Sequence, residues 1–157
     1  ISSFCIIPHE GGHFFTMWAG DLFHAFGGTL FEVGVPAGLT LWFLLRNGKR
    51  LGALTLGWMS VALFNVAKYS GDAQKLELDL IGGASSIEEK MIGHDWYNIL
   101  NMLNLLDATP LVSDLFWSIA FVAGVSAIVL SAGAIYSDHI TKTTLDQKRD
   151  CSRLSSA

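Results

Sequence analysis

Three of the first thirteen residues have side chains that could bind and use a metal ion. His9, Glu10 and His13 form an HExxH pattern, His9-Glu10-Gly11-Gly12-His13. On a helix, positions i and i+4 lie on the same face, so both imidazoles can reach one ion. The glutamate beside them can polarise a metal-bound water and accept its proton. The pattern predicts a zinc site with His9 and His13 as ligands and Glu10 as the general base.

A catalytic zinc site also needs a third protein ligand and an open position. Asp95 is the preferred candidate and His94 the alternative, because both lie just before a predicted helix. Adjacent residues at a helix start differ by about 100° in direction, so only one of them should point at the ion. Charge favours the carboxylate, since two neutral imidazoles and one carboxylate leave a zinc site with a single positive charge.

Four further residues are weaker candidates for the third ligand. Glu32 sits inside an apolar stretch, where it is a ligand, a hydrogen-bond partner of a ligand or an acid facing a pore. Asp72 is a further candidate for the third ligand. His24 follows His13 too distantly along one helix unless the chain folds back, and His139 falls on the opposite side of the predicted membrane.

The distribution of charge predicts a membrane protein. Apolar residues make up 51% and charged residues 15% of the 157 residues, with a formal net charge of −4. The stretches 14–45, 51–67 and 115–137 contain only two charged residues, Asp21 and Glu32. Such segregation favours several membrane spans joined by polar segments. The mild charge gives no support to nucleic-acid binding, and two distant cysteines form no disulfide framework.

These elements predict an all-α, multi-pass transmembrane helical bundle. We expect a motif-bearing helix over 9–25 that is broken at Gly27-Gly28, spans over 29–45, 51–67 and 112–136, and a helical piece near 95–106. Residues 1–136 then form one membrane-embedded domain, with its N-terminal part truncated. Residues 137–157 form a polar, frayed cytoplasmic tail.

Positive residues predict the orientation of these spans. The 46–50 turn carries Arg46, Lys49 and Arg50 without an acid, which favours the cytoplasm. The acidic segment 69–111 then lies on the other side together with residues 9–28, and the tail returns to the cytoplasm. This arrangement would bring the HExxH pattern and Asp95 to the same side of a membrane, most simply the bacterial inner membrane.

Several motifs together resemble a group of uncharacterised bacterial multi-pass membrane proteins with HEGGH and HDW motifs. They are His9–His13, Gly27-Gly28-Thr29-Leu30 with Pro36, Asp72-Ala73, Ile81-Gly82-Gly83 and His94-Asp95-Trp96. The resemblance spans roughly residues 8–107.

More distantly, the layout is similar to the site-2-protease class of intramembrane zinc metalloproteases. That resemblance implies His9, His13 and Asp95 as zinc ligands and Glu10 as the base. The chain departs from the class at residues 105–109, LLDAT, which lack the glycine and the upstream proline of its aspartate motif. The resemblance therefore favours metal binding more than proteolysis.

The leading functional hypothesis is a membrane-embedded zinc hydrolase, most simply a peptidase acting on a membrane protein or peptide. The alternative is a non-catalytic membrane protein that holds a structural or transported metal ion. A haem protein ranks last, because histidines one helical turn apart suit one small ion better than two axial positions. The HExxH pattern is also compatible with polar residues at the solvent-exposed end of a helix, without any metal.

Overall fold

The computed structural model describes residues 3–78, 83 and 86–154, and this part of the chain contains helices and no strands. The predicted all-α class is confirmed. The helices in chain order are α1 (Ser3–Thr16), α2 (Asp21–Leu45), α3 (Lys49–Gly71), α4 (Ile87–Gly93), α5 (Asp95–Met102), the 3-10 turn η1 (Leu106–Ala108) and α6 (Thr109–Leu154). Within the motif Ile81-Gly82-Gly83, only Gly83 lies among the described residues.

Three helical segments are long and apolar enough to cross a membrane, as the sequence predicts. They cover 21–45, 49–71 and 106–145. Their outward faces carry large apolar side chains, among them Leu41, Leu54, Phe121 and Ile128, which are 60–71% exposed. A lipid bilayer would cover such surface, whereas water would favour aggregation.

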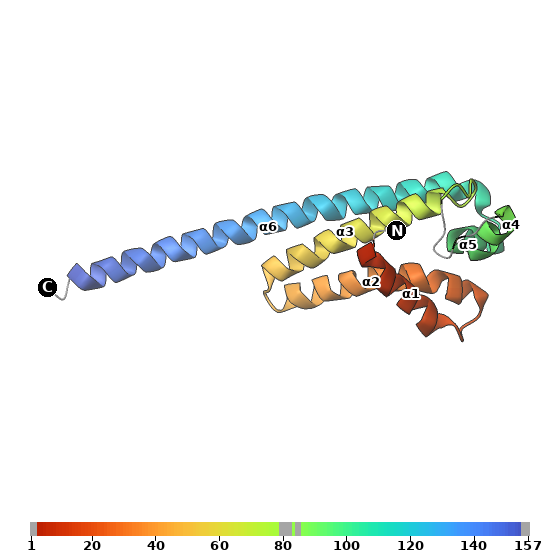
Figure 1. Ribbon diagram of the computed structural model, residues 1–157. Coiled ribbons are helices and arrows are strands. Elements are labelled where there is room, and N and C mark those ends of the chain that lie inside the picture. The colour runs from red at the N-terminus through yellow and green to blue at the C-terminus, as the bar shows by residue number, and fades with distance from the viewer. Residues whose placement is uncertain (1–2, 79–82, 84–85, 155–157) are drawn as a thin grey trace.

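The spans pack in the order α6, α3, α2, and α1 crosses α2 (Figure 1). Small residues line the contact between α3 and α6: Ala120 is fully buried, and Gly124 approaches Ser60 closely. The Ser60 hydroxyl donates a 2.7 Å hydrogen bond to the Ala120 carbonyl. Small residues and cross-helix hydrogen bonds are the usual means of joining membrane helices, since lipid supplies no hydrophobic drive between them.

The start of the chain differs from the sequence-based expectation. The motif-bearing helix begins at Ser3 rather than residue 9 and ends at Thr16. The reversal falls at residues 17–20, where Gly20 has a φ of 91° that favours glycine. The prediction of a helix break at Gly27-Gly28 is wrong, because α2 runs unbroken from Asp21 to Leu45. These two glycines serve close packing instead, as described below.

The C-terminal segment also differs from expectation. The tail expected to fray from residue 137 continues α6 as helix to Leu154, and residues 155–157 lie outside the described part. Figure 1 shows this end of α6 extending past the bundle. Near its base, Arg50 forms an ion pair with Asp138, which ties α6 to the beginning of α3.

A short helical cap closes the opposite end of the bundle. It consists of α4 and α5, which lie beside the end of α3 and the start of α6 (Figure 1). Trp96, Ile99 and Leu100 of α5 pack against Val66 and Tyr69 of α3. This apolar cluster fixes α5, and with it Asp95, over the end of the bundle. The cap helix expected near 95–106 is shorter, ending at Met102.

The two ends of the bundle allow a test of orientation by cysteine labelling. Gln74→Cys marks the cap end and Thr143→Cys marks the projecting part of α6, both at exposed positions. In a background with Cys5 and Cys151 replaced by Ser, a membrane-impermeant maleimide added to intact cells should label Gln74→Cys alone, because Lys and Arg gather at the other end. Labelling of Thr143→Cys alone would reverse the orientation.

Candidate metal centre

The candidate centre lies where α1 crosses α2, and glycines permit the crossing. A Cβ at Gly12 would overlap the Gly27 carbonyl, so the two backbones are in direct contact. A Cβ at Gly28 would come within 2.5 Å of His13 Nε2 and 2.7 Å of His9 Nε2. The space above Gly28 is therefore occupied by both imidazoles of the HExxH pattern.

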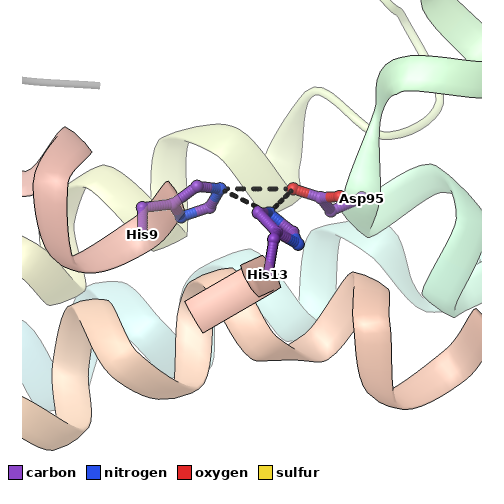
Figure 2. A group of neighbouring side chains, drawn as sticks. All are labelled: His9, His13 and Asp95. Atoms are coloured by element: carbon purple, nitrogen blue, oxygen red, sulfur yellow. Dashed lines mark hydrogen bonds and ion pairs between the residues drawn. The ribbon is translucent and has the colours of Figure 1, made fainter. Parts of the chain in front are cut away.

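Three side chains converge at this crossing (Figure 2). His9 Nε2 lies 3.2 Å from His13 Nε2, and Asp95 Oδ2 lies 3.2 Å from each of these nitrogens. The three atoms form an almost equilateral triangle, contributed by α1 and α5. His9 is 3% exposed, while His13 and Asp95 are partly open to the cavity described below.

The outer nitrogens of both imidazoles are already engaged. His13 Nδ1 lies 2.8 Å from the His24 carbonyl, which only accepts, so Nδ1 carries the proton. His9 Nδ1 donates in the same way to Glu32 Oε2 at 3.0 Å. In the neutral rings, both Nε2 atoms then present lone pairs to the centre of the triangle. A hydrogen bond from the outer nitrogen is what usually orients a metal-binding histidine.

Electrostatics at the triangle favour a positive charge. Burial opposes protonation of His9, but hydrogen bonds to Asp95 and Glu32 outweigh it and raise the pKa of His9 to about 9. A hydrogen bond to Asp95 likewise raises the pKa of His13. Burial opposes ionisation of Asp95, yet the two imidazoles hold its pKa below the usual value. Two lone pairs and a carboxylate oxygen at this spacing attract a cation, either protons or a metal ion.

Glu32 supports the site from within a membrane span. Its side chain is 2% exposed, and Oε1 lies 3.5 Å from Asn65 Nδ2 on α3 while Oε2 faces His9. A carboxylate buried in an apolar helix is costly without such partners. Of the roles open to Glu32 from the sequence, its contacts correspond to a hydrogen-bond partner of His9.

The other candidate ligands point elsewhere. The chain does fold back at 17–20, which brings His24 to α1. There the His24 carbonyl accepts from His13 Nδ1, and the His24 Nδ1 donates to the His13 carbonyl, so the His24 imidazole does not join the triangle. His94 is fully buried with Nε2 3.5 Å from Asp72 Oδ2, and burial lowers the pKa of His94. His139 is exposed on α6 near the opposite end of the bundle. The structure thus brings Asp95, and not His94, to the histidine pair.

A cavity of about 910 Å³ opens onto the triangle. Glu10 is exposed on its wall, near the two histidines in sequence but outside the triangle itself. Lys68 and Asn65 of α3 also line it, with apolar contributions from Ile92 and Met102 of the cap. The cavity is large enough for a small ligand or a short stretch of peptide.

Sequence reasoning missed the roles of Tyr69 and Thr29, which accept hydrogen bonds from α5. Tyr69 Oη accepts a 3.1 Å hydrogen bond from the Asp95 backbone N–H, and Thr29 Oγ1 accepts one from Trp96 Nε1 at 3.2 Å. The placement of Thr29 next to Gly27-Gly28 in the chain is the only sequence signal for the second contact. Nothing in the sequence singles out Tyr69.

Comparisons with protein-family models, with curated proteins and with solved structures found no match.

The role assigned to Gly28 can be tested with a matched pair of glycines on α2. Gly28→Ala should weaken zinc binding at least about tenfold, because the added methyl displaces the two imidazoles whose outer hydrogen bonds orient them. Gly34→Ala is the control, since nothing lies within 4 Å of a Cβ there. It should leave zinc binding unchanged and stabilise the helix by up to about 1 kcal/mol. Equal zinc affinity in both variants, measured by competition with a chelator, would contradict the assignment.

Glu32→Gln tests the support that Glu32 gives to His9. The amide oxygen can still accept from Nδ1, but the loss of charge makes the imidazole a weaker ligand. Zinc affinity should fall about 10- to 100-fold while the helical content and thermal midpoint change little. Glu88→Gln on the exposed surface of α4 is the control. An affinity unchanged by Glu32→Gln would show that the pair does not tune the site.

Proposed function

We propose that this chain is a membrane-embedded zinc hydrolase, with peptide bonds as the first substrates to test. The observation that carries the proposal is the triangle of His9 Nε2, His13 Nε2 and Asp95 Oδ2, with all three separations 3.2 Å. Ligand atoms at about 2.0–2.2 Å from a tetrahedral ion lie roughly 3.3–3.6 Å apart. The triangle therefore suits a small tetrahedral ion with little rearrangement.

The number of side chains in the group supports catalysis over a structural role. Among the described residues, the group contains two histidines and one carboxylate. Structural zinc sites usually have four protein ligands, whereas catalytic sites have three and an open position. The remaining position would face the cavity, where a substrate can enter. This is the argument against the alternative, a membrane protein with a structural or transported ion.

Each residue then has a distinct task. Zinc in such a site lowers the pKa of a bound water toward about 7 and polarises a carbonyl. Glu10 on the cavity wall would accept a proton and return it to the leaving group. Glu32 and the His24 carbonyl hold the imidazoles with their Nε2 atoms turned inward. The triangle is closed to solvent at His9, which is 3% exposed, and open to the cavity at His13 and Asp95.

The resemblance to HEGGH–HDW membrane proteins and, more distantly, to site-2-protease-like enzymes favours the same assignment. It adds intramembrane or membrane-proximal peptides as the substrate class. A bacterial plasma membrane, with the α2–α3 turn and the end of α6 in the cytoplasm, is the localisation that we propose with it. The lipid bilayer is the partner that the apolar helix surfaces require.

The experiment combines metal analysis with a change at Glu10. The purified protein in detergent should contain about one zinc per chain, which His9→Ala with His13→Ala abolishes and His139→Ala preserves. Glu10→Gln should retain zinc, because Glu10 lies outside the triangle, but lose at least about 100-fold in zinc-dependent hydrolysis. Quenched-fluorescence peptides test peptidase activity, and 4-nitrophenyl acetate reports hydrolysis of a generic ester.

Three results would count against this function. Iron in place of zinc would favour redox chemistry, since two histidines and a carboxylate also bind ferrous iron. Loss of zinc in folded Glu10→Gln would make Glu10 a ligand. Stoichiometric zinc without hydrolysis of any probe would favour the non-catalytic alternative.

A further inference from the structure

The beginning of α5 is held from two directions, and both contacts act on the segment that carries Asp95. The first N–H groups of any helix have no partner within the helix and need caps from elsewhere. In α5, the Asp95 N–H donates to Tyr69 Oη at 3.1 Å, and the Tyr97 N–H donates to His94 Nδ1 at 3.1 Å. Side chains thus replace two of the missing helical acceptors.

His94 acts at this position as an N-cap and not as a free imidazole. Because Nδ1 accepts from Tyr97, the neutral ring carries its proton on Nε2. Within the described part of the chain, that buried N–H makes no hydrogen bond, and its closest charged group is the Asp72 carboxylate, with Oδ2 at 3.5 Å. Asp72 is in turn fixed by the backbone N–H groups of Glu77 and Leu78, both at 3.0 Å. The orientation of His94 is therefore set by Tyr97 and Asp72, neither of which belongs to the triangle.

Tyr69 links this cap to the candidate centre. Its ring packs on His94, with centroids 4.2 Å apart and planes 31° apart. The same ring lies 6.3 Å from the His9 ring, centroid to centroid. Tyr69 therefore neighbours both His94 and a histidine of α1, and its hydroxyl accepts from Asp95.

We propose that Tyr69 and His94 are positioning residues that hold the Asp95 carboxylate against His9 and His13, and that neither residue binds the ion. This inference rests on the proposed metal site. Asp95 comes from the short cap helix α5, whereas both histidines come from α1. Fixing the beginning of α5 is what keeps the third corner of the triangle in place before the ion arrives.

Tyr69→Phe removes the acceptor for the Asp95 N–H and keeps the ring that packs on His94. Zinc affinity should fall about 10- to 100-fold, as when an outer partner of a ligand is lost. Exchange of the Asp95 amide with deuterium should become roughly five- to tenfold faster, which is the effect of about one hydrogen bond. Tyr136→Phe, at an exposed tyrosine of α6, is the matched control and should change neither quantity.

At His94, rescue separates a capping role from metal binding. Asn is a good N-cap residue and a poor zinc ligand. His94→Ala should therefore weaken zinc binding about tenfold or more, and His94→Asn should recover most of that loss. If His94 were a ligand, both variants would lose zinc equally. His139→Ala controls for the removal of an exposed histidine.

The two readouts keep this inference separate from the proposed function. A wild-type protein that binds no zinc refutes the function, while amide exchange at Asp95 still tests the contact with Tyr69. Wild-type zinc binding with unchanged affinity and exchange in Tyr69→Phe overturns the role of Tyr69. Equal losses in folded His94→Ala and His94→Asn overturn the role of His94.

Discussion

The candidate centre depends on the direct contact between the backbones of α1 and α2. Gly12 meets the Gly27 carbonyl, and Gly28 leaves room for two imidazoles that would otherwise be displaced. Glycine in a helix interior costs roughly 1 kcal/mol relative to alanine, so three at one crossing are a local penalty to stability. The close approach offsets that penalty with backbone packing, and it brings His9 to Glu32 and His13 to the His24 carbonyl. Without it, neither imidazole would have its outer nitrogen fixed.

The burial of polar groups explains why the surrounding contacts are so specific. Glu32, inside a membrane span, is 2% exposed, and His9 beside that span is 3% exposed, so an unpaired charge on either would be expensive. Each has its partner: Glu32 bridges His9 and Asn65, and His9 faces Asp95 on its other side. Three helices and the cap therefore meet at one polar point within an otherwise apolar bundle. A positive charge between the three inward atoms, from protons or from a metal ion, would complete this network.

The sequence predicts the helical class, the three spans and the pairing of His9 with His13 because each depends on local pattern. Apolar run length marks spans, and histidines four residues apart share a helix face. It does not predict where α1 ends: Gly27-Gly28 has the composition of a helix break, but tertiary packing keeps α2 helical there, and the reversal occurs at Gly20. The choice between Asp95 and His94 depends on Tyr69 and Asp72, which approach α5 only in the folded chain. Sequence spacing carries no trace of those contacts.

The central claim is that two imidazoles and one carboxylate hold a single zinc ion. X-ray absorption spectroscopy of the zinc-loaded protein measures this ligand set directly. The account predicts two imidazole nitrogens and an oxygen shell at about 2.0–2.2 Å, with one imidazole fewer in His13→Ala and an altered oxygen shell in Asp95→Ala. Three or more imidazoles in the wild-type protein, a sulfur ligand at about 2.3 Å, or a spectrum unaffected by Asp95→Ala would contradict it.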